Sequence, residues 1–192
     1  MLETIIELDK ELLLFFNSFH APWLDPIMFW ITKTFFWLPL YLFLLLLVVK
    51  NFKKDAWIML IGIAIAILWA DQITASLMKP FFERLRPSRE PSLQGLVHLV
   101  DGYTGGRYGF ASSHAANTFA TALFFWLLFR ERYRWMWVLF VWAVVMTYSR
   151  IYLGVHYPGD ILAGMLVGLI GAWLGFAVQK LIWNKVKLKI EN

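Results

Sequence analysis

Five long apolar runs, separated by short charged segments, are the feature that most constrains how this chain can fold. A helix needs about 20 predominantly apolar residues to cross the hydrocarbon core of a bilayer. Within that core every backbone amide must bond inside its own segment, so we expect each run to be an α-helix. The runs cover residues 23–49, 56–78, 110–129, 135–152 and 161–183.

The composition agrees with a membrane protein. Of the 192 residues, 60% are hydrophobic and 16% are charged, whereas soluble domains carry roughly 25% charged residues. The chain has no cysteine, which excludes a disulfide framework and a thiolate metal site. No basic helix or patch outside the short loops would suit nucleic acid. The sequence therefore predicts one all-α domain, residues 1–192, that forms a polytopic helical bundle in the lipid bilayer. It does not indicate an oligomeric state.

A further helix is predicted at the N-terminus, which brings the expected number to about six. Residues 3–19 place apolar side chains near helical spacing, with acidic side chains between them. This amphipathic pattern favours a helix that lies in the membrane interface. A spanning position remains the alternative. In the first apolar run, Pro39 predicts a kink or a break.

Short basic segments predict the orientation. If all five runs cross, the segments at residues 50–54, 130–134 and 185–189 lie on one side of the membrane. Lysine and arginine in short loops mark the cytoplasmic side, so the polar segment 79–109 is expected to face outward. This outer segment is itself basic, which is better explained if some of its cations bind a ligand. We expect a bacterial-type inner membrane, with the polar clusters on its periplasmic or extracellular face.

The first polar cluster pairs Lys79 with Arg86, and each of these cations is followed by a proline. Prolines favour an extended or turning segment at a helix exit. Two fixed cations suit a phosphate dianion, because arginine binds as a two-pronged fork and lysine as a point charge. The alternative is a pair of cations that anchor the chain at the membrane surface. Arg84, Arg89 and Arg107 could widen such an anionic pocket.

The second cluster, Ser112, Ser113 and His114, opens the third apolar run. Serines at a helix start cap free backbone amides, and the same amides with the helix dipole bind anions. His114 could give a proton to a leaving oxygen. The alternative is ordinary capping beside a surface histidine.

The third cluster contains Arg150, His156 and Asp160, between the last two apolar runs. A helical turn or a tight turn at Pro158 and Gly159 would keep the histidine close to the aspartate. A carboxylate bonded to one imidazole nitrogen leaves the other nitrogen free as a nucleophile. Arg150 could neutralise the phosphate under attack. A metal site is the rival interpretation, but the outer side offers few carboxylates and many cations that would repel a metal.

Taken together, the three clusters resemble the signature of the phosphatidic acid phosphatase type-2 superfamily. That signature is Lys, six residues, Arg-Pro; then Pro-Ser-Gly-His; then Ser-Arg, five residues, His, three residues, Asp. The chain has Lys79 with Arg86-Pro87, Ala111-Ser112-Ser113-His114, and Ser149-Arg150 with His156 and Asp160. Two positions depart from it, Ala111 for proline and Ser113 for glycine. The resemblance covers residues 79–160.

The resemblance implies a six-helix membrane phosphatase without a metal or other cofactor. It implies that His156 is a nucleophile forming a phosphohistidine, that Asp160 orients it, and that His114 protonates the leaving group. The phosphoryl oxygens would be held by Lys79, Arg86, Ser112, the Ser113 amide and Arg150. The expected partner is a membrane lipid phosphate or diphosphate, with a polyprenyl diphosphate such as undecaprenyl diphosphate preferred. Phosphatidylglycerophosphate or lipid A is the alternative substrate. A transporter or a non-enzymatic membrane protein is a remoter alternative, since no paired repeats are visible.

Overall fold

The chain is almost entirely helical in the computed structural model, which describes residues 2–191, with side chains from 3 to 188. No β-strand occurs among the described residues, and Leu85 and Tyr108 form an isolated antiparallel bridge. The all-α prediction is therefore confirmed. The helices are α1 (Leu2–Asn17), α2 (Asp25–Ile31), α3 (Leu38–Phe52), α4 (Ala56–Asp71), α5 (Lys79–Phe82), α6 (Ser113–Phe129), α7 (Val138–Tyr152) and α8 (Pro158–Glu191).

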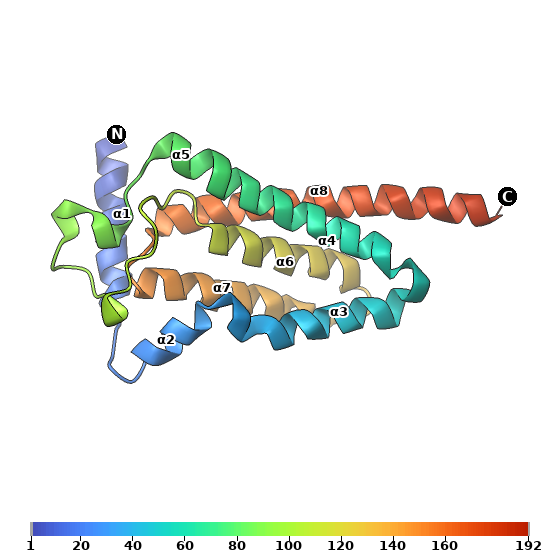
Figure 1. The fold of residues 1–192 in the computed structure, drawn as a ribbon, viewed down its shortest axis with the longest axis horizontal. Coiled ribbons are helices and arrows are strands. Elements are labelled where there is room, and N and C mark those ends of the chain that lie inside the picture. The colour runs from blue at the N-terminus through green and yellow to red at the C-terminus, as the bar shows by residue number, and fades with distance from the viewer. Residues whose placement is uncertain (1, 192) are drawn as a thin grey trace.

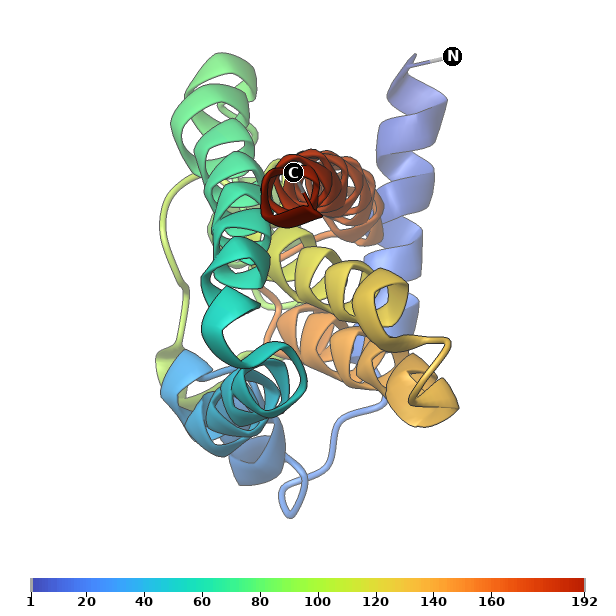
Figure 2. The same cartoon turned by 90° about the vertical axis from the view of Figure 1, so that its right-hand side faces the viewer.

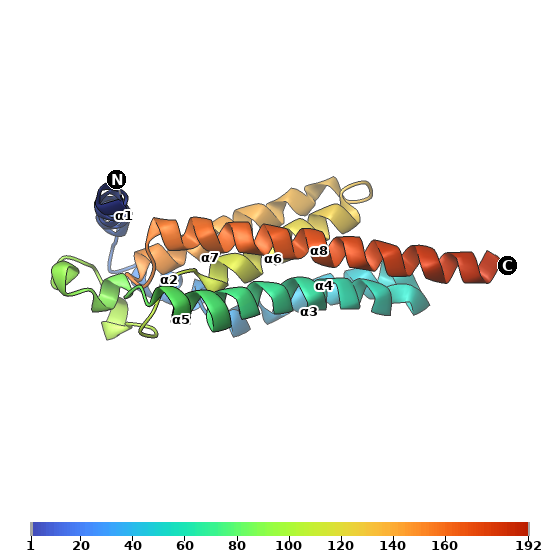
Figure 3. The same ribbon diagram turned by 90° about the horizontal axis from the view of Figure 1, so that it is seen from above.

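Five of these helices, α3, α4, α6, α7 and α8, run side by side as an elongated bundle (Figures 1 and 3). Segments Thr34–Phe82, Arg134–Tyr152 and Pro158–Leu188 are long and apolar enough to cross a membrane. The first of them reverses direction after α3, where Lys53 has φ 51°, and therefore contributes α3 and α4 as two antiparallel passes. α6, which has 17 residues, runs beside them, so a long helix is present for each of the five predicted apolar runs.

The first apolar run is divided as its proline predicts. Residues 23–49 form α2, a short 3₁₀ turn Thr34–Trp37, and α3. Pro39 lies in the first turn of α3, where the missing proline N–H removes no intrahelical hydrogen bond. The break therefore falls before the proline, and α3 alone makes the first long pass.

Close backbone contacts between helices hold the bundle together. α8 meets α6 and α4 at glycines: a Cβ on Gly168 would lie 2.1 Å from the Ala116 carbonyl oxygen, and one on Gly175 would lie 2.3 Å from that of Gly62. Small residues of this kind are typical of helix contacts in membranes, where packing replaces the hydrophobic drive between helices. The outward faces of the long helices carry exposed leucine, valine and phenylalanine side chains, which suit contact with lipid.

α1 lies across one end of the bundle, with its axis roughly perpendicular to the long helices in Figures 1 and 3. Its outer face exposes Ile5, Leu8, Leu12 and Phe15. This orientation agrees with the interfacial position predicted for residues 3–19, because a helix across the bundle end runs along the membrane surface.

The polar loop 83–112 lies at the same end as α1, and the three basic segments lie at the other end (Figure 1). Figure 2 looks along the bundle from that basic end, where α8 finishes. An ion pair of 2.9 Å joins Lys187 on α8 to Asp55 beside the α3–α4 turn. The side chain of Lys189 lies outside the described residues.

Candidate active site

The three polar clusters meet at the end of the bundle that carries α1 and the loop 83–112. His156 contacts Arg86 from the first cluster, and Ser113 from the second cluster contacts Lys79. The sequence had placed these residues at least 34 positions apart. Their convergence follows from the antiparallel passes, which return each cluster to the same end. In the first two clusters, Lys79 starts α5, Arg86 lies in the following loop, and Ser112 caps α6. In the third cluster, Arg150 is in the last turn of α7, His156 lies in the short loop after α7, and Asp160 is in the first turn of α8.

His156 and Asp160 form a buried pair. The Nδ1 atom of His156 lies 3.1 Å from Oδ2 of Asp160, and the two residues are 1% and 0% exposed. The same carboxylate oxygen accepts the backbone N–H of Tyr157 at 3.1 Å. α8 begins at Pro158, so the histidine precedes the helix and the aspartate sits in its first turn. Both geometries considered from the sequence are partly right.

The hydrogen bonds define the tautomer of His156. Nη1 of Arg86 lies 3.2 Å from Nε2 of the imidazole. A guanidinium can only donate, so Nε2 must accept with its lone pair. The ring proton is then on Nδ1, where it is donated to Asp160. This is the tautomer that a nucleophilic Nε2 requires.

The surroundings also keep the imidazole neutral. Burial, followed by the positive charges of Arg86, Arg150 and Lys79, holds the pKa of His156 well below its usual value of 6.5. Desolvation and nearby cations both disfavour imidazolium. The same two effects act on Arg86, because burial and the charge of Arg150 lower its pKa to about 10. It remains protonated at neutral pH, so the site combines a neutral imidazole with fixed positive charge.

Three of these cations have no carboxylate partner. Within the described part of the chain, no ion pair involves Lys79, Arg86 or Arg150. Arg150 is 2% exposed, donates to the hydroxyl of Thr32, and has an Nε atom that is buried without a partner. Buried cations that lack counter-ions are costly unless an anion joins them. The arrangement therefore suits an anionic ligand.

The second cluster combines helix capping with a contact to the first. The Ser112 hydroxyl accepts the Ala115 N–H at 3.4 Å, as the predicted N-cap does. The amides of Ser113 and His114 open α6, where no helical carbonyl reaches them. Ser113 replaces the glycine of the resembled signature, and its hydroxyl accepts a 2.5 Å hydrogen bond from Nζ of Lys79. The substitution thus adds an oxygen that holds the lysine in place.

A π-helical stretch positions that lysine. Residues Gln72–Met78 form π turns, and the N–H of Lys79 bonds to the carbonyl of Thr74, five residues earlier. The hydroxyl of Thr74 also lies 2.8 Å from the Ser113 hydroxyl. Residues five apart lie closer to one helix face in a π-helix than in an α-helix, and here both contact Ser113. Thr74 was not among the residues predicted from the sequence.

His114 faces a polar cavity inside the bundle end. The cavity has a volume of about 260 Å³, and its wall includes Tyr41, Asp71, Ser113 and Asn117. The Oδ1 atom of Asn117 is buried and has no hydrogen-bond partner. Asp71 makes no ion pair with any described residue. Its side chain lines the cavity beside His114.

Arg84 has a role that its sequence position did not indicate. Its guanidinium donates to Oδ1 of Asp160 at 2.9 Å and to Oδ2 of Asp9 at 2.7 Å. Arg84 therefore forms ion pairs with two carboxylates and does not widen the anionic pocket. Arg89 bonds to Thr104 and Gly105 in the loop.

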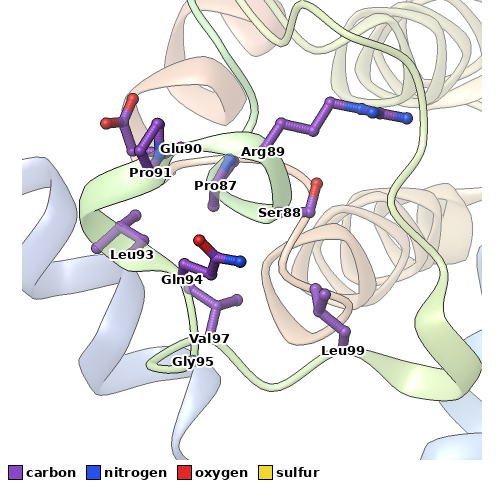
Figure 4. Close-up of a pocket in the computed structure, with 10 residues that line it drawn as sticks. All are labelled: Pro87, Ser88, Arg89, Glu90, Pro91, Leu93, Gln94, Gly95, Val97 and Leu99. Carbon is purple, nitrogen blue, oxygen red and sulfur yellow. The ribbon is translucent and has the colours of Figure 1, made fainter.

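A second cavity, of about 340 Å³, lies within the loop 83–112 and contains none of the predicted site residues. Figure 4 shows Ser88, Gln94 and Leu99 around it, with the Arg89 side chain directed away. No group of three or more His, Cys, Asp or Glu within residues 3–188 has the spacing of a metal site. The predicted clusters place Arg86, a cation without a carboxylate partner among the described residues, beside His156.

Residues 55–183 match the model of the PAP2 superfamily. The chain belongs to the PAP2 superfamily. It is 42% identical to the lipid A 4'-phosphatase of Bacteroides thetaiotaomicron over 181 residues, which are 93% of this chain and 80% of that protein. It is 29% identical to an undecaprenyl-diphosphatase of Sulfolobus acidocaldarius over 91% of this chain and 78% of that protein. The crystal structure of Aquifex aeolicus LpxE superposes with a TM-score of 0.70 and 26% identity, covering 88% of this chain and 95% of the other.

This PAP2 protein is an integral membrane enzyme that hydrolyses phosphate ester bonds of lipids. Membership of the superfamily, which the three clusters had indicated, is confirmed. The preferred substrate is not: the relatives support a lipid A phosphatase, the alternative, better than a polyprenyl diphosphate phosphatase.

Proposed function

We propose that the enzyme hydrolyses a phosphate monoester of a glycolipid of the lipid A class, at the outer face of a bacterial-type inner membrane. The substrate class is supported by the greater identity to a lipid A 4'-phosphatase than to an undecaprenyl-diphosphatase. The observation that carries the chemistry is the neutral, correctly protonated imidazole of His156 beside three cations without counter-ions.

In the first step the phosphate occupies the cationic site. Lys79, Arg86, Arg150 and the first amides of α6 hold its oxygens. Nε2 of His156 attacks phosphorus, the N–P bond forms, and the P–O bond to the lipid breaks. Phosphoryl transfer of this kind depends mainly on positioning and charge stabilisation. Asp160 stabilises the charge that develops on the imidazole through the Nδ1 proton.

A proton must reach the lipid oxygen as that bond breaks. Protonated His114 supplies it, and the lipid leaves as an alcohol. In the second step neutral His114 takes a proton from water, and the water oxygen attacks the phosphohistidine. The N–P bond breaks, inorganic phosphate leaves, and both histidines return to their starting forms.

The cavity beside His114 supports a leaving group that carries hydroxyls. Asp71, Asn117 and Tyr41 present a carboxylate, an unpartnered amide oxygen and a phenol to the space that the leaving group would enter. A sugar can satisfy these groups, whereas a hydrocarbon chain would leave them without partners. An apolar cavity of about 340 Å³ adjoins this polar one and shares Tyr41 and Asn117 with it. It would take part of an acyl chain.

Phosphate release from a panel of lipids tests the substrate. Purified enzyme in mixed micelles is assayed with lipid A, phosphatidylglycerophosphate, phosphatidate and undecaprenyl diphosphate, with His156→Ala as the blank. The highest kcat/KM is expected for lipid A. A higher value for undecaprenyl diphosphate would overturn the substrate class. Excess EDTA should leave the rates unchanged; a loss restored by one divalent metal would overturn the mechanism.

The polar cavity gives a second test of the leaving group. Asn117→Leu removes the unpartnered amide and should lower kcat/KM for lipid A roughly 10- to 100-fold, because buried polar groups matched to a substrate hydroxyl discriminate strongly. The kcat/KM for an aryl phosphate should change less than about threefold, because an aryl leaving group has no sugar hydroxyl for this amide to bind. Equal losses on both substrates would mean that Asn117 supports the fold and not the sugar.

A further inference from the structure

α1 lies outside the region that matches the PAP2 family model, which starts at residue 55. One face of this helix is nevertheless buried against the candidate active site. Asp9, Leu13 and Asn17 recur at four-residue spacing and are 9%, 0% and 2% exposed. Residues at this spacing share a helix face. Two polar residues on the buried face need partners there.

Those partners lie at both ends of the segment 150–160. This segment contains His156 and Asp160, which we call the dyad. The Nδ2 atom of Asn17 donates to the carbonyl of Tyr152 at 2.8 Å, just after Arg150. Leu13 packs with Tyr157 in one apolar cluster. Oδ1 of Asp9 accepts the N–H of Gly159 at 2.7 Å, just before Asp160. α1 therefore fixes the segment 150–160 at its start, its middle and its end.

The Asp9 carboxylate also reaches the dyad through Arg84. Its Oδ2 accepts from Nη2 of Arg84 at 2.7 Å, while Nη1 of the same guanidinium donates to Oδ1 of Asp160 at 2.9 Å. The guanidinium lies over the ring of Tyr157, 3.9 Å from its centroid. The chain of contacts runs from Asp9 through Arg84 and Asp160 to His156. Gly159 makes room for it, since a Cβ there would lie 2.7 Å from Oδ2 of Asp9.

We propose that Asp9 is a positioning residue for the His156–Asp160 dyad and that it acts by holding Arg84. With two carboxylates on its two terminal nitrogens, Arg84 stays in one orientation and leaves the other oxygen of Asp160 to the imidazole. Without Asp9, Arg84 keeps a single anchor beside an anion site, and its free nitrogens can turn toward the phosphate. Asp160 would then orient the imidazole less well. This inference rests on the proposed roles of His156 and Asp160.

Asp9→Asn is the matched variant. Asparagine keeps the shape and an oxygen for the Gly159 N–H, but it removes the charge that binds Arg84. The assay uses a water-soluble aryl phosphate, so that any effect of α1 on lipid access is excluded. The expected result is a kcat about 10-fold lower with KM unchanged, in the range found for residues that orient catalytic ligands. Glu11→Gln makes the same charge change on an exposed position of α1 and should leave both constants unchanged.

Arg84→Lys cuts the same link from the loop and leaves α1 intact, because an ammonium cannot bridge both carboxylates with a fixed fork. It should lower kcat to a similar extent. The double variant should be no slower than the slower single variant, because both changes break one chain of contacts. Losses that multiply would show that Asp9 acts independently of Arg84 and would overturn the inference, as would full kcat in either single variant.

The control variant His156→Ala distinguishes a failure of this inference from a failure of the proposed function. If His156→Ala keeps activity, the proposed nucleophile is wrong and Asp9 has no dyad to position. If His156→Ala is inactive while Asp9→Asn has wild-type kcat, the nucleophile stands and the role of Asp9 alone is overturned. A raised KM with unchanged kcat in Asp9→Asn would also overturn it, since that result indicates weaker substrate binding.

Discussion

Nη1 of Arg86 lies 3.2 Å from Nε2 of His156, the nitrogen that we propose attacks phosphorus. In the proposed mechanism the substrate phosphate has to occupy part of the space where this guanidinium lies. Substrate binding must move the guanidinium from the imidazole to the phosphoryl oxygens. Arg86 keeps bonds to the carbonyl oxygens of Tyr108 and Val155, which limit how far it moves.

Replacing Arg86 should weaken phosphate binding. A hydrogen bond to a charged group contributes roughly 1.5–3 kcal/mol, so Arg86→Ala should raise the inhibition constant of inorganic phosphate roughly 10- to 100-fold. The measurement is competitive inhibition of aryl phosphate hydrolysis. Arg132→Ala, which removes an exposed cation from the segment between α6 and α7, is the control. An unchanged constant in Arg86→Ala would place the phosphate elsewhere.

The lowered pKa of His156 predicts where activity is lost in acid. Because the pKa in the folded enzyme lies below 6.5, the imidazole stays neutral as the pH falls from about 8 to 6.5, and protonates only below that window. In His114→Ala with an aryl phosphate, kcat/KM should be flat above pH 6.5 and fall below it, after correction for ionisation of the substrate. An acid limb with a midpoint at or above about pH 7 would contradict the neutral nucleophile.

His114 should matter in proportion to the basicity of the leaving group. An alkoxide leaving a lipid monophosphate needs a proton, whereas an aryl oxide or a phosphate leaving a diphosphate is already stable as an anion. General acid catalysis is worth roughly 100- to 10,000-fold where it is needed. His114→Ala should therefore reduce kcat/KM for phosphatidate far more than for an aryl phosphate. An equal loss on both would withdraw the acid role.

The bundle and the three clusters could be predicted because their signals are local in sequence. Apolar runs of helical length and fixed spacings such as that from His156 to Asp160 need no knowledge of the fold. The link between Asp9 and Arg84 joins residues 75 positions apart, and nothing in either segment identifies the partner. Part of the signal was present, since Asp9 and Asn17 share the helix face of Leu13 within an amphipathic pattern. A polar residue on a buried face indicates that a partner exists, but the fold is needed to identify it.

The effect of Ser113 in place of glycine could not be predicted from the sequence either. A hydroxyl at the start of α6 could have blocked the approach of a phosphate. In the fold it turns toward Lys79 and Thr74, and which way it turns depends on the π-helical register of residues 72–78. No local sequence pattern predicts that register.

The orientation of the protein in the membrane can be tested with single cysteines, because the chain has none. Leu96 in the loop 83–112 and Arg132 between α6 and α7 are exposed, and these two segments lie at opposite ends of the bundle (Figure 1). An impermeant thiol reagent should label Leu96→Cys in cells whose inner membrane is intact and label Arg132→Cys only after lysis, because short basic loops stay in the cytoplasm. The reverse pattern would place the candidate site on the cytoplasmic face.

Direct detection of the covalent intermediate bears on the nucleophile itself. In His114→Ala an aryl phosphate can still transfer its phosphoryl group, but hydrolysis of the phosphohistidine lacks its base, so the intermediate should accumulate. The reaction is quenched in alkali, which preserves phosphohistidine, and the peptides are analysed by mass spectrometry. The account predicts one phosphoryl group on His156, and none when His156→Ala is combined with His114→Ala. Phosphorylation of another residue, or steady turnover by the His156→Ala enzyme, would contradict it.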